Sequence, residues 1–409
     1  MTERLPKKTY LFFTAQSINL TTAVMSVAMA AIVGSRLTDD PAMATIPYGF
    51  QFLFVMLVTY PASWFMSRYG RKAGFMLGNL CLAIAGVLGF LAIQKDAFLL
   101  LVAAHSALGA FIAFANFYRF AAADGIPAAL KPRVISLVVA GGVLAAFLGP
   151  MLSNNLRSVV GYQEFAISYI FFVILALVSM GIVLMIPRDP GVGRKSTPAS
   201  TGRITASSLR ELLGHRQIAL AIALSALGYG IMNLLMVQAS LHMEVICSDF
   251  SDVSQAIQWH VVAMFAPSFF TGKLIRLLGN HAVLYLGLIL LVMTSAANLL
   301  SQGYAMTVTG LILLGLGWNF TYVGGGALLT TLTGSHPEAM KIQGINDFCI
   351  SVMATIGAFL PSVLQYSIGW QGTNTLSLAL CLVALVVSVS LLSVGNRNQL
   401  ATERYPAHE

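Results

Sequence analysis

The chain has 409 residues, of which 57% are hydrophobic and only 9% are charged, whereas soluble globular chains carry about 25% charged residues. Its mean hydropathy is +0.80 and its formal net charge is +8. A soluble core could not bury this much apolar surface in a chain of this length, so the composition excludes a soluble protein and predicts a membrane protein.

Twelve apolar runs of spanning length follow one another along the chain, since about 20 residues cross a hydrocarbon core as an α-helix. The runs are continuous and do not alternate, which favours helices over the strands of a barrel. We therefore predict an all-α membrane protein with twelve transmembrane helices at residues 10–34, 46–67, 73–93, 97–119, 132–155, 163–186, 216–240, 254–273, 281–300, 304–328, 344–366 and 371–393.

Positive charge is distributed unevenly between the two ends of these spans. With a cytoplasmic N-terminus, all of the 23 lysine and arginine residues except Arg36, Lys95 and Arg157 fall on the cytoplasmic side. This asymmetry obeys the positive-inside rule, so we predict a multi-pass protein of the bacterial inner membrane with both termini in the cytoplasm. A nucleic-acid partner would require cations gathered on one soluble domain, and none is expected.

The second half of the chain repeats motifs of the first half. The segment IPAALKPR, which begins at Ile126, returns as HPEAMKIQ from His336. The segment AAFLGP, which begins at Ala145, returns at nearly the same spacing as GAFLPS from Gly357. Repeated motifs in the same order indicate two homologous halves of six helices each.

The longest polar stretch in the chain separates the two halves and is rich in Pro, Gly, Ser, Thr and cations, which is typical of a linker. We therefore predict four regions: an N-terminal six-helix bundle at residues 1–186, a cytoplasmic linker at 187–215, a C-terminal six-helix bundle at 216–395 and a cytoplasmic tail at 396–409.

The sequence contains no pattern typical of a catalytic or metal site. The seven histidines are scattered, and no cysteine pair has the spacing of a disulfide framework or a metal knuckle. No nucleophile, base and oxyanion donor come together along the chain. We therefore predict no catalytic residue, no metal and no cofactor, and we do not expect an enzyme. The four cysteines are Cys81, Cys247, Cys349 and Cys381.

A dense group of cations lies between the second and third spans, in the stretch SRYGRK. It resembles the loop signature of the major facilitator superfamily, which reads roughly G-x-x-x-D-R-x-G-R-K. Ser63 and Ser67 replace the first Gly and the Asp of that signature, and Gly279 in the second half echoes its second Gly. The matching residues are Arg68, Gly70, Arg71 and Lys72.

Two further features extend this resemblance over the whole chain. The pair Gly149 and Pro150 in the fifth span matches a second signature of the superfamily, and His105 precedes Gly109 in the fourth span where the family usually has an arginine. Twelve spans in two halves with a long central linker agree with it. The resemblance implies the major facilitator fold and a secondary transporter that works by alternating access.

In the superfamily the basic loop latches the cytoplasmic helix ends when the carrier opens outward. Arg71 is a planar donor fork that can bind a carboxylate, and Asp124 is the nearest acid by topology. The alternative is that these cations only obey the positive-inside rule. We predict a gating set of Arg68, Arg71, Lys72 and Asp124.

Polar residues form stripes on the first, fourth, seventh and tenth spans, which line the central cavity in the superfamily. No Asp or Glu falls at the middle of any predicted span, so we expect a polar, neutral and aromatic cavity that suits a flat heterocycle. The alternative for each amide is a hydrogen bond to a neighbouring helix. His105 is included because ionisable groups within spans are costly and usually functional. The predicted substrate-binding residues are Asn19, His105, Asn116, Asn233, Trp318, Asn319 and Tyr322.

Two stretches, WHVVAMFAPSFFTGKLI from Trp259 and GWNFTYVGGGALL from Gly317, resemble the branch of bacterial carriers in which riboflavin transporters have been proposed. The resemblance implies a carrier for a small, neutral heterocyclic or vitamin-like solute, with riboflavin as the first candidate. An efflux or uptake carrier for drugs or siderophores is the alternative, and both import and export stay open. The expected partners are the solute and the lipid bilayer, and a monomer is expected.

Overall fold

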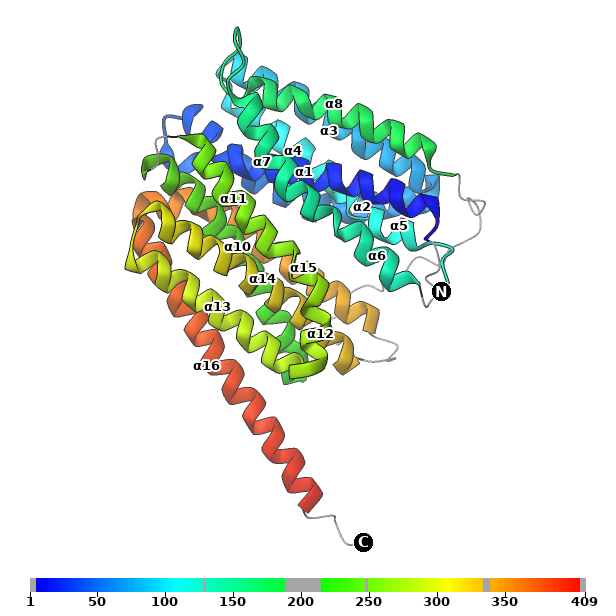
Figure 1. Cartoon of the computed structure of the whole chain (residues 1–409), viewed down its shortest axis with the longest axis vertical. Coiled ribbons are helices and arrows are strands. Elements are labelled where there is room, and N and C mark those ends of the chain that lie inside the picture. The colour runs from blue at the N-terminus through cyan, green and yellow to red at the C-terminus, as the bar shows by residue number, and fades with distance from the viewer. Residues whose placement is uncertain (1–4, 128–129, 188–214, 247–248, 334–338, 405–409) are drawn as a thin grey trace.

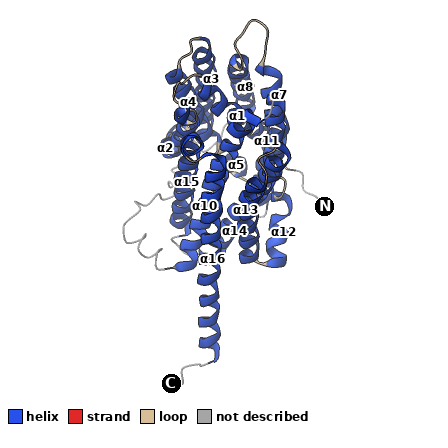
Figure 2. Cartoon of the chain, turned by 90° about the vertical axis from the view of Figure 1, so that its left-hand side faces the viewer, coloured by secondary structure: helices blue, strands red, loops and turns tan. Residues whose placement is uncertain are grey.

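The computed structural model of the protein describes residues 5–127, 130–187, 215–246, 249–333 and 339–404. Within these ranges every regular element is a helix (Figure 2). The elements are α1 (Lys7–Arg36), the 3-10 helix η1 (Pro41–Met43), α2 (Ile46–Tyr69), α3 (Arg71–Gln94), α4 (Phe98–Ala115), α5 (Tyr118–Ala123), α6 (Lys131–Val139), α7 (Gly141–Arg157), α8 (Ala166–Met185), α10 (Arg216–Ile246), α11 (Phe250–Phe265), α12 (Ser268–Leu278), α13 (Asn280–Leu300), α14 (Tyr304–Thr333), α15 (Ala339–Ser367) and α16 (Gly369–Arg404).

In the described part of the chain, eleven helical segments are long and apolar enough to cross a membrane. The pair α11 and α12, which is bent by 45°, raises this number to as many as twelve. The segments follow the apolar runs of the sequence, and the predicted fourth and fifth spans are built from α4 with α5 and from α6 with α7. The prediction of an all-α, twelve-span membrane protein is confirmed.

The helices before residue 188 and those after residue 214 form two groups, which occupy the upper and lower parts of Figure 1. The most extensive contacts between the groups are two helix crossings, α2 against α15 and α7 against α11, and α1 also touches α10 and α11. The linker predicted at 187–215 lies outside the described residues except for Pro187 and His215. Helix α16 continues to Arg404, so the boundary predicted at residue 395 falls inside a helix.

Two glycines show the internal repeat in the backbone itself. Gly70 ends α2 and precedes α3 with φ 88° and ψ 155°, and Gly279 ends α12 and precedes α13 with φ 87° and ψ 159°. Because essentially only glycine adopts this region, both halves turn at the same place through the same conformation. The echo in the sequence therefore corresponds to a shared backbone geometry.

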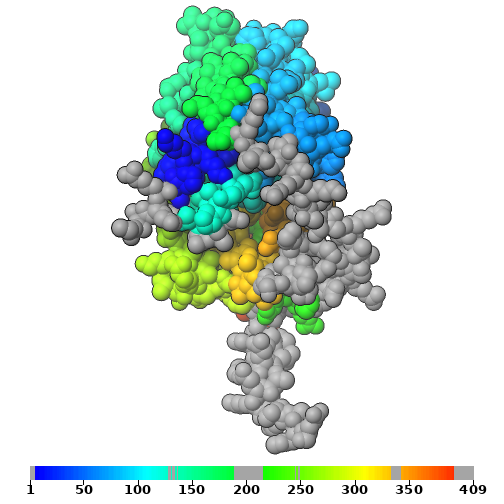
Figure 3. All heavy atoms as spheres, turned by 90° about the vertical axis from the view of Figure 1, so that its right-hand side faces the viewer, coloured from blue at the N-terminus to red at the C-terminus, as the bar shows by residue number. Residues whose placement is uncertain are grey.

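The two ends of the molecule differ in charge. We call the end that holds the start of α1 and the turn at Gly70 the basic end, and the opposite end, where α1 and α7 finish at Arg36 and Arg157, the far end. Figure 3 shows the molecule from the basic end, where the dark blue start of α1 lies beside the cyan residues of the α5 region.

Candidate functional site

The crossing of α2 with α15 depends on a glycine. A Cβ atom added at Gly49 would lie 2.2 Å from the ring of Phe359, so only glycine lets these helices approach so closely. Two hydroxyl groups bridge the crossing nearby: Thr45 Oγ1 donates to the carbonyl oxygen of Phe359 at 3.1 Å, and Ser362 Oγ donates to that of Ala42 at 2.6 Å. Packing and hydrogen bonds therefore join the two groups of helices here.

The crossing of α7 with α11 also depends on a glycine that packs against an aromatic ring. A Cβ atom at Gly142 would lie 2.8 Å from the ring of Phe265. The ring of Phe265 in turn meets Trp318 of α14 edge to face, with centroids 6.1 Å apart and an interplanar angle of 72°. This crossing is therefore in direct contact with the aromatic residues of the C-terminal group.

Four aromatic side chains, which we call the aromatic cluster, gather beside this crossing. Trp318 and Tyr322 stack with centroids 5.1 Å apart and planes 8° apart. Tyr229 of α10 meets their rings edge to face, at 5.6 Å and 6.1 Å, and Phe265 completes the cluster. Such ring pairs add about 0.5–1.5 kcal/mol each beyond the burial of their area.

The aromatic cluster contains a buried donor that lacks an acceptor. Trp318 is only 7% exposed, and its indole Nε1 has no hydrogen-bond partner among the described residues. A buried N–H without a partner costs about 1–3 kcal/mol, and each such group in a folded protein calls for an explanation. A solute with an acceptor atom would satisfy this donor.

A hydrogen bond links the neighbourhood of the cluster to the N-terminal group. Asn233 lies one turn after Tyr229 on α10, and its Oδ1 accepts a long hydrogen bond of 3.5 Å from the hydroxyl of Tyr48 on α2. Its Nδ2 donates to the carbonyl oxygen of Ala354 at 2.9 Å. Both asparagine and tyrosine are buried. A tyrosine of the N-terminal group therefore meets an amide of the C-terminal group one turn from Tyr229 of the aromatic cluster.

The structure thus brings together three of the predicted substrate-binding residues, Asn233, Trp318 and Tyr322. Their role in binding stays a prediction. Sequence reasoning missed Tyr48 and Phe265, which complete the arrangement. Tyr48 lies near the start of its span, where a tyrosine is ordinarily interpreted as an interfacial residue, and an isolated Phe in an apolar run gives no signal.

His105 lies elsewhere, in a buried network inside the N-terminal group. Its Nδ1 is 2.9 Å from Gln51 Oε1 and its Nε2 is 2.8 Å from the hydroxyl of Tyr169. Because a carboxamide oxygen only accepts, Nδ1 carries the proton and Nε2 accepts from Tyr169. Ser26 donates a second hydrogen bond, of 2.5 Å, to the same Gln51 oxygen. The network is neutral and uses both ring nitrogens.

Asn319 is adjacent to Trp318 in sequence but points to the bend between α11 and α12. Pro267 causes this bend because it has no N–H to donate to the preceding turn. The Nδ2 of Asn319 donates to the carbonyl oxygen of Met264 at 2.8 Å and to Ser268 Oγ at 2.7 Å, and its Oδ1 accepts from the hydroxyl of Thr271 at 2.8 Å. Asn319 therefore satisfies polar groups of the broken helix.

The two remaining amides of the predicted site lie on the N-terminal group. Asn19 is 1% exposed, and its Nδ2 donates a long hydrogen bond of 3.4 Å to Gln16 one turn earlier on α1. Its Oδ1 has no partner among the described residues. Asn116 ends α4 and is exposed. No contact described in the structure joins either residue to the aromatic cluster.

The predicted gating set lies at the basic end. Arg71 Nε donates to Asp124 Oδ2 at 2.8 Å, and Lys8 donates to the backbone carbonyl oxygen of the same aspartate. These three residues all belong to the N-terminal group. The pairing therefore ties the start of α3 to the end of α5, and the gating role of Arg71 and Asp124 stays a prediction.

The other two cations of the gating set have different surroundings. Lys72 Nζ donates to the carbonyl oxygens of Leu184 and Ile186, at 2.8 Å and 3.1 Å. A cation at the C-terminus of a helix satisfies its free carbonyl groups and complements its dipole, so Lys72 caps α8. Arg68 is exposed and lies over the ring of Tyr69, 5.9 Å from its centroid.

An ion network closes the far end between the two groups of helices. Within the N-terminal group, Glu164 pairs with Arg36 and, at 3.3 Å, with Arg157. The same arginines reach acids of the C-terminal group: Arg36 Nη2 lies 3.6 Å from Glu244 Oε1, and Arg157 Nη1 lies 3.8 Å from Asp249 Oδ1. We call these five residues the far-end network.

Glu164 holds both arginines of the far-end network in place. Burial raises the pKa of Glu164, but the neighbouring guanidinium groups of Arg36 and Arg157 outweigh it and lower the net pKa below the ordinary carboxyl value. The pairing is therefore present above the ordinary carboxyl pKa and is lost as the pH falls through the lowered one. At neutral pH Glu164 is therefore charged and pairs with both arginines.

Aromatic contacts support the far-end network. Phe165 and Phe250, which belong to different groups of helices, meet edge to face with centroids 5.1 Å apart. The guanidinium carbon of Arg157 lies over both rings, at 5.6 Å and 5.0 Å. Cation–π contacts of this kind contribute about 0.5–1 kcal/mol at exposed sites. Arg157 therefore contacts both groups of helices at once.

Comparisons with known families and structures agree with this arrangement of membrane-spanning helices. A family model described as Major Facilitator Superfamily matches residues 11–339. The chain belongs to the Major Facilitator Superfamily. It is therefore a multi-pass membrane transporter of the secondary type and not an enzyme.

Two curated relatives cover nearly the whole chain. The chain is 34% identical to the riboflavin transporter RfnT of Brucella anthropi over 378 residues. This match covers 91% of this chain and 93% of the relative. The chain is 26% identical over 387 residues to the uncharacterized MFS-type transporter YdeG of Bacillus subtilis, with 90% and 86% covered. The resemblance to the branch that includes riboflavin transporters is confirmed by the first of these relatives.

A solved structure has the same fold. The crystal structure of the nucleoside transporter NupG matches with a TM-score of 0.69 and covers 95% of this chain and 99% of that chain. The two sequences are 12% identical. The match therefore supports the major facilitator fold alone.

The buried network of His105 leads to a prediction about stability. Replacing Tyr169 with Phe removes the donor to His105 Nε2 and leaves a buried nitrogen unpaired, which costs about 1–3 kcal/mol. We expect a lower thermal midpoint in detergent, with an unchanged half-saturation constant for solute because the network lies outside the aromatic cluster. Tyr60→Phe, at a 63% exposed tyrosine, is the matched control and should change neither value. An altered half-saturation constant at unchanged stability would place His105 in solute binding instead.

Proposed function

We propose that the protein carries a small, neutral and planar heterocyclic solute, with riboflavin as the first candidate, across the bacterial inner membrane by alternating access. The single observation that carries this proposal is the meeting of Tyr48, from the N-terminal group, with Asn233 and the aromatic cluster, from the C-terminal group. A site shared by two halves can be opened to either side when the halves rock against each other.

The chemistry of these groups favours a planar solute without charge. The aromatic cluster contains no acid or base that is charged at neutral pH, so it offers stacking surfaces and the free Nε1–H of Trp318. Tyr229 and Tyr322 are only partly buried, whereas Trp318 is buried, so part of each tyrosine stays accessible to a solute. Riboflavin combines a flat ring system with carbonyl acceptors and hydroxyl groups, and the relative RfnT is named as a riboflavin transporter.

The two ends of the molecule support a mechanism. The far end is closed across the two groups of helices by the far-end network and by the α2 and α15 crossing. We assign the basic end to the cytoplasm because of the positive-inside rule, so the structure corresponds to a state closed toward the outside. Transport then requires the far-end contacts to break while the cytoplasmic ends come together.

The ion pairs at the far end are weak enough to break when the gate opens. The pair between Arg36 and Glu244 is partly exposed, with side-chain exposures of 42% and 34%, and such pairs contribute about 0–1 kcal/mol. Packing at glycine crossings contributes the larger share. We infer that the ion pairs align the two halves and shift the equilibrium toward the closed state. The glycine crossings set how closely the two halves approach each other in that state.

The proposal is tested by uptake of riboflavin into proteoliposomes together with a panel of siderophores and dyes. We expect saturable riboflavin uptake, and we expect Trp318→Ala to raise its half-saturation constant about 2- to 12-fold, because a lost ring contact costs about 0.5–1.5 kcal/mol. Trp259→Ala, at a 46% exposed tryptophan, is the matched control and should leave the constant unchanged.

Two results would contradict this proposal. Saturable transport of a siderophore or dye without riboflavin transport would favour the alternative carrier for such compounds. A Trp318→Ala protein with a lower thermal midpoint and an unchanged half-saturation constant would show that the tryptophan only packs the C-terminal group.

The gate is tested by labelling a buried position at the α2 and α15 crossing. In a protein whose own cysteines are replaced, Ser362→Cys places a thiol at a side chain that is 2% exposed. We expect Glu164→Gln to speed the reaction of this thiol with maleimide about fivefold at neutral pH. The substitution removes the acid that holds Arg36 in place for its pair with Glu244, which should destabilise the closed state by about 1 kcal/mol. Without that substitution, the access of maleimide to the thiol should increase only in acid, as Glu164 takes up its proton. Because maleimide reacts with the thiolate and slows in acid, this access is measured as the labelling rate relative to that of a fully exposed cysteine at the same pH.

Asp39→Asn is the matched control for the gate. Asp39 is an exposed acid at the far end and belongs to no ion pair among the described residues. If this substitution accelerated labelling as much as Glu164→Gln, net charge alone would explain the effect and the far-end network would have no gating role.

A further inference from the structure

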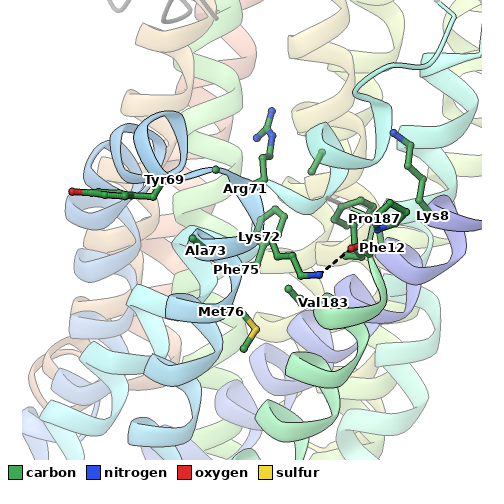
Figure 4. Close-up of a pocket in the computed structure, with 13 residues that line it drawn as sticks. Lys8, Phe12, Tyr69, Arg71, Lys72, Ala73, Phe75, Met76, Val183 and Pro187 are labelled. Atoms are coloured by element: carbon green, nitrogen blue, oxygen red, sulfur yellow. Dashed lines mark hydrogen bonds between the residues drawn. The ribbon is translucent and has the colours of Figure 1, made fainter. Parts of the chain in front are cut away.

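A cavity of about 550 Å³ opens at the basic end among α1, α3, α5 and α8 (Figure 4). It lies within the N-terminal group and is separate from the aromatic cluster, whose residues all belong to α10, α11 and α14. Its inner wall is apolar and includes Phe12, Phe75 and Val183. Three cations, Lys8, Arg71 and Lys72, also line it. The cavity therefore combines an apolar wall with concentrated positive charge.

The charge in this cavity is only partly compensated. Asp124 is the acid that pairs with a cation of the cavity in the described structure, through Arg71 Nε. Lys8 and Lys72 donate to backbone carbonyl oxygens, which carry no net charge. The described lining thus holds three positive charges, and Asp124, which is paired with Arg71, compensates one of them from beside the cavity. An anion is the ligand that this imbalance favours.

Arg71 retains donors for such an anion. A guanidinium group has five N–H donors in a planar fork, and only the Nε of Arg71 is hydrogen-bonded to a described residue. Figure 4 shows its terminal nitrogens directed away from Phe75, Met76 and Val183 of the apolar wall. Two parallel N–H groups match the oxygens of a phosphate. The group is therefore arranged to bind one more oxyanion.

The surroundings favour a phosphate that is attached to an acyl chain. Beside the cavity, α8 exposes the apolar side chains of Leu177, Leu184 and Met185, which are 61%, 61% and 70% exposed. Trp64 and Tyr69 near the end of α2 are 55% and 52% exposed, and exposed aromatic residues of this kind mark the level of the lipid headgroups. The cations thus lie at headgroup depth, next to a surface for acyl chains.

We propose that this cavity binds the phosphate headgroup of an anionic phospholipid, with Lys8, Arg71 and Lys72 around the phosphate and the acyl chains on the exposed face of α8. Basic pockets between membrane helices on the cytoplasmic side are suited to such headgroups. The lipid ties together the starts of α1 and α3 and the end of α8. It acts at the N-terminal group alone and does not depend on which solute is carried.

The experiment is native mass spectrometry of the purified full chain in detergent, titrated with phosphatidylglycerol or with phosphatidylcholine of the same acyl chains. We expect tighter retention of phosphatidylglycerol. The double variant Lys8→Gln, Arg71→Gln should lose up to about 25-fold in its affinity, since a direct ion pair of each partly exposed cation with the phosphate contributes up to about 1 kcal/mol, or about fivefold. If that variant does not fold, Lys8→Gln alone leaves the pair of Arg71 with Asp124 intact and should lose about fivefold.

The matched control is the double variant Lys7→Gln, Arg68→Gln. It removes the same charge from exposed positions at the same end that do not line the cavity, and it should lose less than about twofold because a neutral detergent has no membrane surface potential. Equal losses in the two double variants would overturn the proposal. So would equal retention of the two lipids, or complete displacement of phosphatidylglycerol by millimolar inorganic phosphate, which would identify a site for free anions.

Discussion

Close helix packing at two glycines sets how near the two groups of helices can come. Gly49 accommodates the ring of Phe359, and Gly142 accommodates the ring of Phe265. In a membrane, where lipid is as apolar as the side chains, such close approach is a main source of helix association. A larger side chain at either glycine would push an aromatic ring aside, and overpacking of this kind typically costs about 1–3 kcal/mol. The two crossings therefore fix the positions of the side chains that lie between the two groups of helices.

The candidate solute site depends on these crossings directly. Phe265 is both the ring that packs on Gly142 and an edge of the aromatic cluster. Tyr48, which bonds to Asn233, is adjacent to Gly49. A change in either crossing would therefore move a residue of the site, which gives a physical route by which solute binding and the rocking of the two halves influence each other. The far-end ion pairs are weaker and exposed, so they bias this motion without blocking it.

The fold could be predicted from the sequence because its signals are local. A run of about 20 apolar residues defines a span wherever it occurs, and the bounds of the helices follow the predicted runs closely. The site depends on the rotation of each helix about its axis, which composition does not determine. Trp318 and Asn319 are neighbours on α14, yet one packs in the aromatic cluster and the other satisfies the bend at Pro267. His105 lies on the polar stripe of the fourth span in the sequence, but its side chain bonds to Tyr169 inside the N-terminal group.

We propose that one solute site is shared by both groups of helices beside the glycine crossings. A cryo-electron microscopy structure of the protein with riboflavin would reveal where the solute binds. We expect ligand density that contacts Tyr48 from one group and Trp318 or Tyr322 from the other, with an acceptor atom near Trp318 Nε1. Density confined to one group of helices, or found only in the cavity at the basic end, would contradict it.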